Sequence, residues 1–341
     1  MSLMWCLEPS RISIRLGRKS TSAFLRRSNR PPDGRRAMAV QQISVRHDTT
    51  YAYFAPASLS YYRACLQPLS QVRCNHFVQK LESFALHVDP APRLTLRERD
   101  VFANVQAYFE IDQPHDRLLV RSEAKLSQTP IGELPLAETP ELLKPWESLL
   151  LPEVRASLPT NGFIACIYPS QRVPDAADAA DIIEFAAESF TPERPIVDAL
   201  MDFTQRIHQS FSYEGGSTHV DTPVTEAWLN RKGVCQDFSH FGLTGLRGLG
   251  LLTAYVSGYM LTEPPEGEEK LVGSDASHAW IALWVPGFGW LHADPTNNCL
   301  VDERYIVTAI GRDYSDIPPL QGVSYGADSQ PPVVGVTVSR T

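Results

Sequence analysis

Three residues in the second half of the chain have the types and the order that nucleophilic cysteine chemistry requires. Cys235 follows Lys232-Gly233, which breaks a helical run, and it precedes apolar residues that recur at helical spacing. We therefore expect Cys235 at or near a helix N-terminus, where the helix dipole and unpaired N–H groups favour a thiolate. His278 and Asp294 follow, and they supply a proton acceptor and a group that orients it.

Two predicted strands bring the histidine and the aspartate together. The run HAWIALWV alternates like a half-buried strand, PGFG is a turn signal, and WLHADP is typical of a second short strand. In a hairpin, the start of the first strand lies beside the end of the second. His278 and Asp294 therefore become neighbours, although they are 16 positions apart in the sequence. The helix that starts near Cys235 is expected to end at Gly248 and Gly250, and TAYVSGYM follows as another strand.

The blocks GVCQDFSHF, SGY and SHAWIALWVPGFGWLHADPTNN, in this order, resemble the catalytic core of the transglutaminase-like superfamily, specifically its bacterial branch. The resemblance is close over residues 195–315 and extends more weakly to a β-rich region before them. It implies a papain-like active site, with the nucleophile of the family at Cys235, its base at His278 and its acid at Asp294. The chain departs from the family pattern at Ala103, where glycine is more usual.

The resemblance and the strand patterns together predict an α+β fold. Residues 38–128 are expected to form an N-terminal β-sandwich, because strand candidates there are separated by Pro, Asp and Asn turn signals. Residues 129–195 form a proline-rich connector, with short helices expected at 140–150 and 178–190. The catalytic core, a papain-like transglutaminase core, is assigned to residues 196–341.

The first 37 residues differ from the rest of the chain, with nine Lys and Arg against two Asp and Glu. They lack a continuous apolar stretch, so we expect a disordered basic tail and no secretory signal. Three interpretations are open: a transit peptide, a tail that binds nucleic acid or membrane, and a translation start at Met38. We favour the third, because the sequence after Met38 begins like the N-terminus of the family.

No cofactor or metal is predicted. The chain has no P-loop and no G-x-G-x-x-G motif, and Cys235, His240 and His278 lack the spacing of zinc ligands. No apolar run reaches 18 residues, so no membrane span is expected, and the core predicts no nucleic-acid partner. The six cysteines form no C-x-x-C pair, which favours reduced thiols and a cytoplasmic protein.

Four further side chains are candidates for the substrate cleft: Trp228, Gln236, Tyr259 and Trp280. The backbone N–H of Cys235 is expected to bind the oxyanion of the tetrahedral intermediate, with Gln236 and Trp228 as candidates for the second donor. Packing is the simpler role for Trp228. The loop over residues 262–275 is acidic and rich in Pro and Gly, and it either covers the cleft or is a solvated connector.

The predicted function is a cysteine-dependent amide-bond hydrolase that acts on a peptide or protein substrate through a thioester. Two alternatives stay open. A protein-glutamine transglutaminase uses the same triad and differs only in whether an amine or water resolves the thioester. A catalytically silent interaction module keeps the fold without the reaction, and the intact triad argues against it. Prokaryotic relatives in the resembled family are mostly peptidases, which favours hydrolysis. The sequence specifies no oligomeric state.

Overall fold

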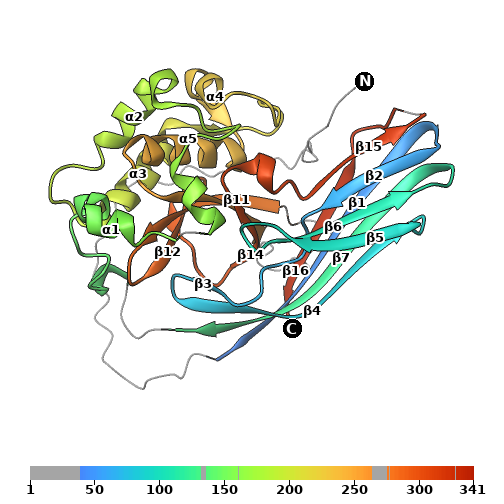
Figure 1. Ribbon diagram of the computed structural model, residues 1–341, viewed down its shortest axis with the longest axis horizontal. Coiled ribbons are helices and arrows are strands. Elements are labelled where there is room, and N and C mark those ends of the chain that lie inside the picture. The colour runs from blue at the N-terminus through green and yellow to red at the C-terminus, as the bar shows by residue number, and fades with distance from the viewer. Residues whose placement is uncertain (1–38, 132–135, 160, 263–274, 276, 327) are drawn as a thin grey trace, which may run out of the picture.

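The computed structural model describes residues 39–131, 136–159, 161–262, 275, 277–326 and 328–341. Figure 1 shows two lobes side by side, one with helices over a sheet and one built of long strands. The expected α+β class, with a β-rich N-terminal region, is confirmed. In the described part of the chain, no helix combines the length and the apolar character needed to cross a membrane.

The strand lobe is a β-sandwich of two antiparallel sheets. Its strands are β1 (Gln41–Ala57), β2 (Leu59–Ala64), β3 (Val72–Cys74), β4 (Phe77–Asp89), β5 (Leu94–Arg99), β6 (Val105–Ile111), β7 (His115–Pro130), β15 (Leu320–Tyr325) and β16 (Val333–Arg340). The larger sheet has the order β16-β1-β7-β4-β3, and the smaller has the order β15-β2-β6-β5. Leu118 and Val120 of β7 are fully buried in the same cluster as Tyr62 and Phe109 of the smaller sheet, so the core of the sandwich lies between the sheets.

The structure differs from the predicted division of the chain at its C-terminal end. We assigned residues 196–341 to the catalytic core, but the last two strands complete the sandwich. Strand β15 pairs with β2, with Leu320 opposite Ala64, and β16 pairs with β1, with Val338 opposite Val45. A local strand pattern identifies a strand without naming its partner, and these partners lie more than 250 residues away.

The helical lobe holds a second five-stranded sheet, in the order β13-β12-β11-β10-β14. Its elements are α3 (Ile196–Ser210), β8 (Ser212–Tyr213), α4 (Val224–Asn230), β9 (Lys232–Gly233), α5 (Cys235–Gly248), β10 (Thr253–Met260), β11 (Ser277–Val285), β12 (Gly289–Asp294), β13 (Cys299–Leu300), β14 (Tyr305–Gly311) and η5 (Tyr314–Asp316). Helix α5 packs against β10 and β11, and α2 (Ala180–Ala187), α3 and α4 surround it on its other sides (Figure 1).

The proline-rich connector supplies part of this helical layer. It contains η1 (Leu136–Glu138), η2 (Trp146–Leu150), α1 (Pro152–Ala156), η3 (Gly162–Ile167), η4 (Ala176–Asp178) and α2 (Ala180–Ala187). Helix α2 contacts α5 at two glycines. A Cβ atom at Gly245 would lie 2.8 Å from the Cβ of Ala186, and one at Gly248 would lie 2.2 Å from the Cγ1 of Ile183. The close approach of the two helices therefore depends on the glycines of α5.

Side-chain amides of the sandwich hold the edge of the core sheet. Gln79 of β4 donates to the carbonyl of Val307 at 2.8 Å and accepts its N–H at 2.9 Å. Asn104 makes the same pair of bonds with Ile310, and Gln128 donates to the carbonyl of Tyr305 at 2.8 Å. These amides bind the backbone of β14 as a neighbouring strand would, and so they fix β14 against the sandwich.

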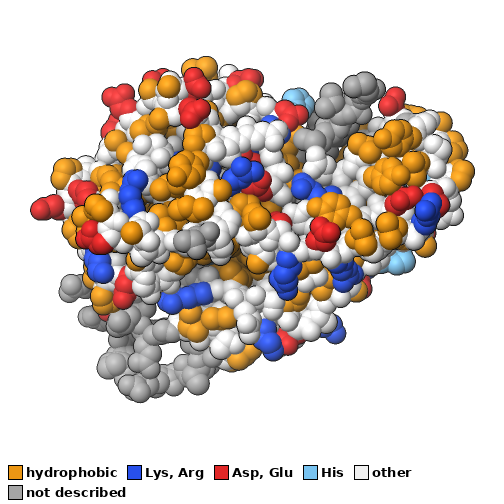
Figure 2. Space-filling model, in the orientation of Figure 1, with side chains coloured by type: hydrophobic (Ala, Val, Ile, Leu, Met, Phe, Trp, Pro, Cys, Tyr) orange, Lys and Arg blue, Asp and Glu red, His pale blue; other side chains and the backbone are white. Residues whose placement is uncertain are grey.

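The outer face of the smaller sheet is apolar and exposed. Val323 of β15 lies opposite Tyr61 of β2, and Leu96 of β5 lies opposite Tyr108 of β6. Figure 2 shows the hydrophobic side chains gathered over β15, β2 and β6 at this end of the molecule. These four side chains are exposed, so substitutions of them are expected to leave the helical lobe in place.

Replacing Gln79 with alanine tests the connection between the lobes. The Gln79→Ala variant leaves the buried N–H of Val307 without its acceptor and removes one of two hydrogen bonds to the Val307 carbonyl, which the Leu69 N–H still reaches at 3.2 Å. We expect a cost of about 2 kcal/mol. We expect a clear fall in the midpoint of chemical denaturation. Gln113→Ala, on an exposed turn of the same lobe, is the matched control and should change the midpoint little. Equal midpoints for the two variants would contradict the proposed role of Gln79.

Candidate active site

Helix α5 begins at Cys235, as the sequence predicts, and an acidic side chain closes its first turn. The Oδ2 atom of Asp237 accepts the N–H of Val234 at 2.8 Å and the hydroxyl of Thr218 at 2.7 Å. A Cβ atom at Gly233 would lie 2.6 Å from that oxygen, so only glycine leaves room for Asp237 to fold back. The block GVCQD therefore places Cys235 on the first turn, where N–H groups have no partner within the helix.

The predicted hairpin is present and carries the other two residues. Strands β11 and β12 pair with Val285 opposite Gly289 and Ile281 opposite Ala293. At its open end, Nε2 of His278 lies 2.7 Å from Oδ2 of Asp294. Because a carboxylate only accepts hydrogen bonds, Nε2 carries the proton of this contact.

The SGY block lies directly behind the histidine. Gly258 of β10 is opposite His278 in the sheet. A Cβ atom at Gly258 would lie 2.0 Å from the carbonyl oxygen of Ile306 and 2.7 Å from the Trp280 ring. Glycine at this position therefore allows β14 and the Trp280 ring to approach the strand that carries His278.

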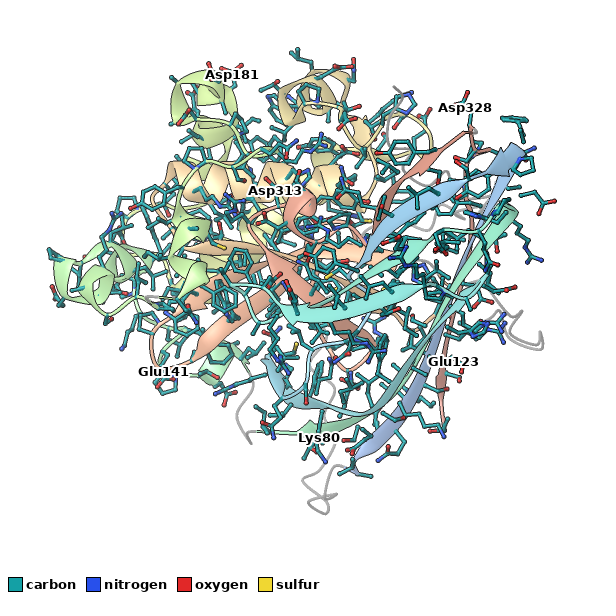
Figure 3. All side chains as sticks on the ribbon, turned by 45° about the vertical axis from the view of Figure 1, so that its right-hand side comes forward. Lys80, Glu123, Glu141, Asp181, Asp313 and Asp328 are labelled. Atoms are coloured by element: carbon teal, nitrogen blue, oxygen red, sulfur yellow. The ribbon has the colours of Figure 1, made fainter. Side chains whose placement is uncertain are left out.

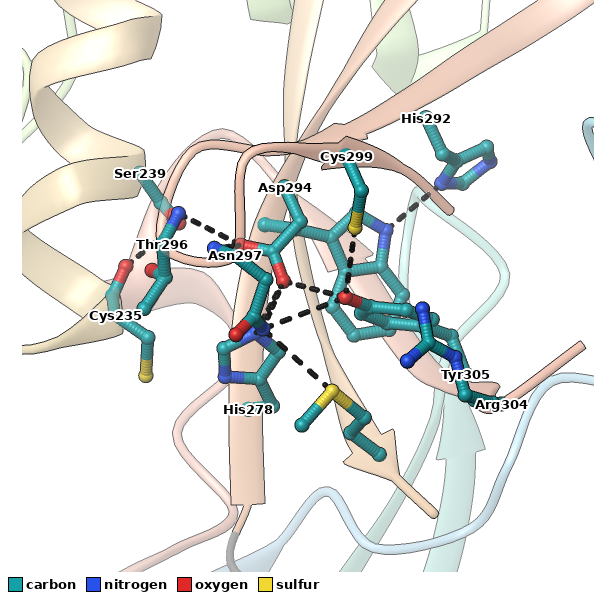
Figure 4. Close-up of polar contacts among 12 residues, drawn as sticks. Cys235, Ser239, His278, His292, Asp294, Thr296, Asn297, Cys299, Arg304 and Tyr305 are labelled. Atoms are coloured by element: carbon teal, nitrogen blue, oxygen red, sulfur yellow. Dashed lines mark hydrogen bonds and ion pairs between the residues drawn. The ribbon is translucent and has the colours of Figure 1, made fainter. Parts of the chain in front are cut away.

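Asp294 is fully buried and accepts hydrogen bonds at both oxygens (Figure 4). Its Oδ1 accepts the backbone N–H groups of Thr296 at 2.8 Å and Asn297 at 3.2 Å. Its Oδ2 accepts from His278, from the Asn297 side-chain amide at 2.7 Å and from the Tyr305 hydroxyl at 2.7 Å. This number of donors is what an ionised carboxylate needs to remain stable without water.

The histidine and the aspartate stabilise each other as an ion pair. Burial alone lowers the pKa of His278, but the charge and hydrogen bond of Asp294, with a smaller contribution from Cys235, raise it well above its usual range. Burial alone raises the pKa of Asp294, but His278, Tyr305 and Asn297 lower it. The pair is therefore an imidazolium and a carboxylate at neutral pH.

Cys235 faces the other side of the imidazole. Figure 4 shows its thiol directed at the His278 ring, on the side away from Asp294, where the second ring nitrogen lies. A hydrogen bond between Cys235 and His278 contributes to the raised pKa of the histidine. The Cys235 carbonyl accepts the Ser239 hydroxyl at 2.8 Å, which ties the residue into the first turn. The three predicted catalytic residues thus lie in one row, in the order nucleophile, base and acid.

Sequence comparison accounts for both lobes. The bacterial transglutaminase-like N-terminal region matches residues 43–127, and the transglutaminase-like superfamily core matches residues 183–295. An uncharacterized protein of Mycobacterium tuberculosis (strain ATCC 25618 / H37Rv) is 40% identical over 300 residues, which cover 86% of this chain and 90% of that protein. The chain belongs to the transglutaminase-like superfamily. The resemblance inferred from the sequence blocks is thereby confirmed.

Other relatives of this transglutaminase-like protein point the same way. An uncharacterized protein of Mycobacterium leprae (strain TN) is 29% identical over 299 residues, 88% of this chain and 99% of that protein. A Pseudomonas aeruginosa protein-glutamine gamma-glutamyltransferase is 32% identical over 96 residues, 26% of this chain and 14% of that protein. The crystal structure of a candidate cysteine protease from Cytophaga hutchinsonii has a TM-score of 0.66 and 17% identity, and covers 89% of this chain and 91% of that chain, which shows a shared fold. Together these findings support a cysteine-dependent activity.

Two of the four cleft candidates lie on the helical side of the transglutaminase-like core. Trp228 is buried, with its ring centroid 4.6 Å from that of Phe241. It therefore packs between helices, which is the simpler of the two roles considered for it from the sequence. Gln236 is also buried, and its amide donates to the carbonyl of Val220 at 3.2 Å. Neither contact directs a donor toward Cys235, so the structure gives no support to either as the second oxyanion donor.

The other two candidates are buried on the strand side. Tyr259 contacts His47 of the sandwich, with 3.0 Å between its hydroxyl and Nδ1, and therefore lies at the junction of the lobes. Trp280 is fully buried and donates its indole N–H to His292 at 3.0 Å. Its ring packs behind His278, with 6.2 Å between the ring centroids. Trp280 thus supports the histidine from behind and does not line an open cleft. The expected loop at 262–275 lies almost entirely outside the described residues.

The sequence interpretation missed the residues that hold Asp294 and its turn. Asn297 lies within the quoted block DPTNN, and its spacing from Asp294 is that of an Asx-type turn, which was a usable signal. Tyr305 follows on a separate strand and gave no such signal. His208 of α3 is exposed and bonds the carbonyl of Thr296 in this turn through Nδ1 at 2.9 Å.

No metal site forms around the triad. Within the described ranges, no group of three or more His, Cys, Asp or Glu side chains is arranged to hold a metal ion. His240 lies on the far side of α5, stacked on Tyr255 and accepting the N–H of Tyr314 at 3.3 Å. Asp313, labelled in Figure 3, lies next to it at the start of η5 and is almost fully buried.

Alkylation with iodoacetamide at pH 6 should label Cys235 before the other described thiols. Cys235 is partly exposed and its thiol is directed at the His278 ring, which is the setting of a reactive cysteine. Burial raises the pKa of Cys65 and Cys166 to about 12, and it also raises the pKa of Cys74. Peptide mapping by mass spectrometry measures the order of labelling.

Two variants make this alkylation test specific. His278→Ala should slow labelling of Cys235 sharply. Without the imidazole, only the dipole of α5 is left to stabilise a negative charge on the sulfur, and it contributes only about 0.3–1 kcal/mol. His87→Ala, on the exposed side of β4, is the control and should leave the rate unchanged. Equal labelling of all thiols, or labelling that is indifferent to His278, would identify Cys235 as a structural cysteine.

Proposed function

We propose that the protein is a cysteine-dependent amide-bond hydrolase, a peptidase or amidase that acts through Cys235, His278 and Asp294. The observation that carries this proposal is the row of three groups in which a helix-borne thiol faces an imidazole that is bonded to a buried carboxylate at 2.7 Å. Family membership supports the same chemistry. The catalytic roles and the outcome of the reaction are what the experiments below test.

In the first half of the reaction, the sulfur of Cys235 attacks the carbonyl carbon of the substrate amide. The proton of the thiol resides on Nδ1 of His278, and the charged ring then donates it to the nitrogen of the leaving amine. The C–N bond breaks and a thioester remains on Cys235. Asp294 holds Nε2 of the ring throughout, which keeps Nδ1 directed at the sulfur.

In the second half, water resolves the thioester. His278 removes a proton from the water, the oxygen attacks the thioester carbon, and the C–S bond breaks. The products are a carboxylic acid and the starting pair, with the sulfur of Cys235 released as a thiolate and the proton from water on His278. The backbone N–H of Cys235 serves as one oxyanion donor, since it belongs to the first turn of α5.

A second candidate function is transfer of the acyl group to an amine. The observation that favours it is the match to the Pseudomonas aeruginosa protein-glutamine gamma-glutamyltransferase over 96 residues. The thioester chemistry is shared up to the arrival of the acceptor. Hydrolysis is our first choice, because it needs no second substrate site beside the thioester. The proposal includes a peptide or protein substrate and, from the reduced thiols expected of the sequence, a cytoplasmic location.

Release of amine from a library of peptide amides should be detected with the wild-type protein and abolished in Cys235→Ala. Asp294→Asn should fold but turn over substrate roughly 10⁴-fold more slowly. An amide nitrogen in place of Oδ2 cannot accept the hydrogen bond from Nε2 of His278. Circular dichroism confirms that each variant is folded. Near-normal turnover of Asp294→Asn would remove Asp294 from the mechanism.

The same assay with an added labelled primary amine distinguishes the two functions. For a hydrolase, the label should enter glutamine-bearing protein far more slowly than free acid is formed. Incorporation at a rate that rivals hydrolysis would assign the protein as a transglutaminase. Absence of both products in the presence of a folded wild-type protein would favour the silent interaction module.

A further inference from the structure

Tyr305 is the first residue of β14 and is fully buried beside the triad. Its ring packs against Trp280, with 5.3 Å between centroids, and its carbonyl accepts the Gln128 amide of the sandwich. A phenylalanine would satisfy this packing equally well. The hydroxyl is therefore the part of the side chain that calls for an explanation.

The partners of that hydroxyl, among the described residues, all lie at the site. It donates to Oδ2 of Asp294 at 2.7 Å, and it lies 3.4 Å from both the Asn297 amide nitrogen and the Cys299 sulfur. Burial raises the pKa of Tyr305 first, and the Asp294 charge raises it further, so the phenol keeps its proton. The hydroxyl is thus a permanent donor to the catalytic carboxylate.

The acceptor oxygen is shared. Oδ2 of Asp294 also accepts from His278 Nε2 and from the Asn297 amide, each at 2.7 Å. The hydrogen bond that the Tyr305 hydroxyl donates to Oδ2 offsets part of the negative charge of the carboxylate. Less of that charge then acts on the imidazolium of His278. Because Oδ1 is held by two backbone N–H groups, the carboxylate stays in place without the hydroxyl. Charge is therefore the property that Tyr305 controls.

We propose that Tyr305 is a positioning residue whose hydroxyl competes with His278 for Oδ2 of Asp294 and thereby weakens the hold of Asp294 on the histidine proton. This inference rests on the proposed function, since a base that must later return its proton to a leaving amine cannot bind that proton too tightly. Tyr305 acts only through Asp294 and contacts no substrate.

Other ionisable groups surround Asp294 and His278, and the test has to hold them constant. They are Cys235 of α5, Cys299 of β13, Tyr305 of β14, His292 behind Trp280, His208 of α3 at the 295–298 turn, and the exposed Asp302–Arg304 ion pair. Removing the Cys235 thiol eliminates its contribution to the titration of His278 and leaves Asp294 and Tyr305 in place.

The direct test is a titration of His278 by NMR, with ¹⁵N in the imidazole rings. Three proteins are compared: Cys235→Ala, Cys235→Ala with Tyr305→Phe, and Cys235→Ala with Tyr62→Phe. The last is the matched control, since Tyr62 is a buried tyrosine of the sandwich whose hydroxyl bonds Tyr53 at 3.0 Å. The His278 signal is assigned by its loss in a His278→Ala variant.

We expect the titration midpoint of His278 to rise by roughly 0.5–1 pH unit in the Tyr305→Phe protein, and to be unchanged in the Tyr62→Phe control. Removing a positive dipole from Oδ2 favours the charged ring, so the sign of the shift is upward. In the protein that retains Cys235, Tyr305→Phe should lower kcat/KM and move the alkaline limb of its pH profile to higher pH.

A midpoint that stays the same or falls would overturn the inference, and a loss of thermal stability without a shift would assign Tyr305 a packing role only. The titration needs no turnover, so it separates the two claims. A raised midpoint in a protein that hydrolyses no amide would retain the role of Tyr305 and reject the proposed function. Amide hydrolysis by the wild-type protein, together with equal His278 midpoints with and without Tyr305→Phe, would support the proposed function and reject the role of Tyr305.

Discussion

A buried, ionised carboxylate organises this protein. Asp294 is fully buried, and its charge is stabilised by three side-chain donors at Oδ2 and by two backbone N–H groups at Oδ1. These donors come from β11, from the turn after β12 and from β14. The strands must therefore be in register before the charge is stable, and the same charge then keeps the His278 ring protonated and directed at Cys235. Stability of the sheet and readiness of the nucleophile thus depend on one set of hydrogen bonds.

The N-terminal lobe takes part in this arrangement. Strand β14 lies at the edge of the core sheet, and amides from Gln79, Asn104 and Gln128 bind its backbone. They secure the strand that brings Tyr305 to Asp294. On the other side, the glycines of α5 allow α2 to pack closely, which fixes the helix that carries Cys235. The sandwich and the connector therefore position the two halves of the site, although neither supplies a member of the triad.

Local patterns predicted the part of the site that is local in the chain. The helix start at Cys235 follows from the Lys232-Gly233 break and the apolar spacing after it, and the hairpin that joins His278 to Asp294 follows from alternation and a turn. Contacts between distant segments left no comparable signal. The bond between Gln79 and Val307 joins residues 228 positions apart, and β16 returns from the end of the chain to pair with β1. The sequence offers Trp228, Tyr259 and Trp280 as candidates for the cleft and cannot tell a cleft wall from a packed ring, whereas in the structure all three side chains are buried.

The proposed mechanism requires a covalent bond between the substrate and Cys235, and trapping that bond tests the mechanism most directly. The protein would be mixed with an activated ester of an acylated amino acid, quenched in acid within milliseconds to seconds, and analysed by intact mass and peptide mapping. We predict one added acyl group on the peptide that contains Cys235, removable by hydroxylamine as expected of a thioester. No adduct should form on the Cys235→Ala variant. Turnover of the ester with no acyl group on Cys235, or with the same adduct in the Cys235→Ala variant, would contradict the proposed mechanism.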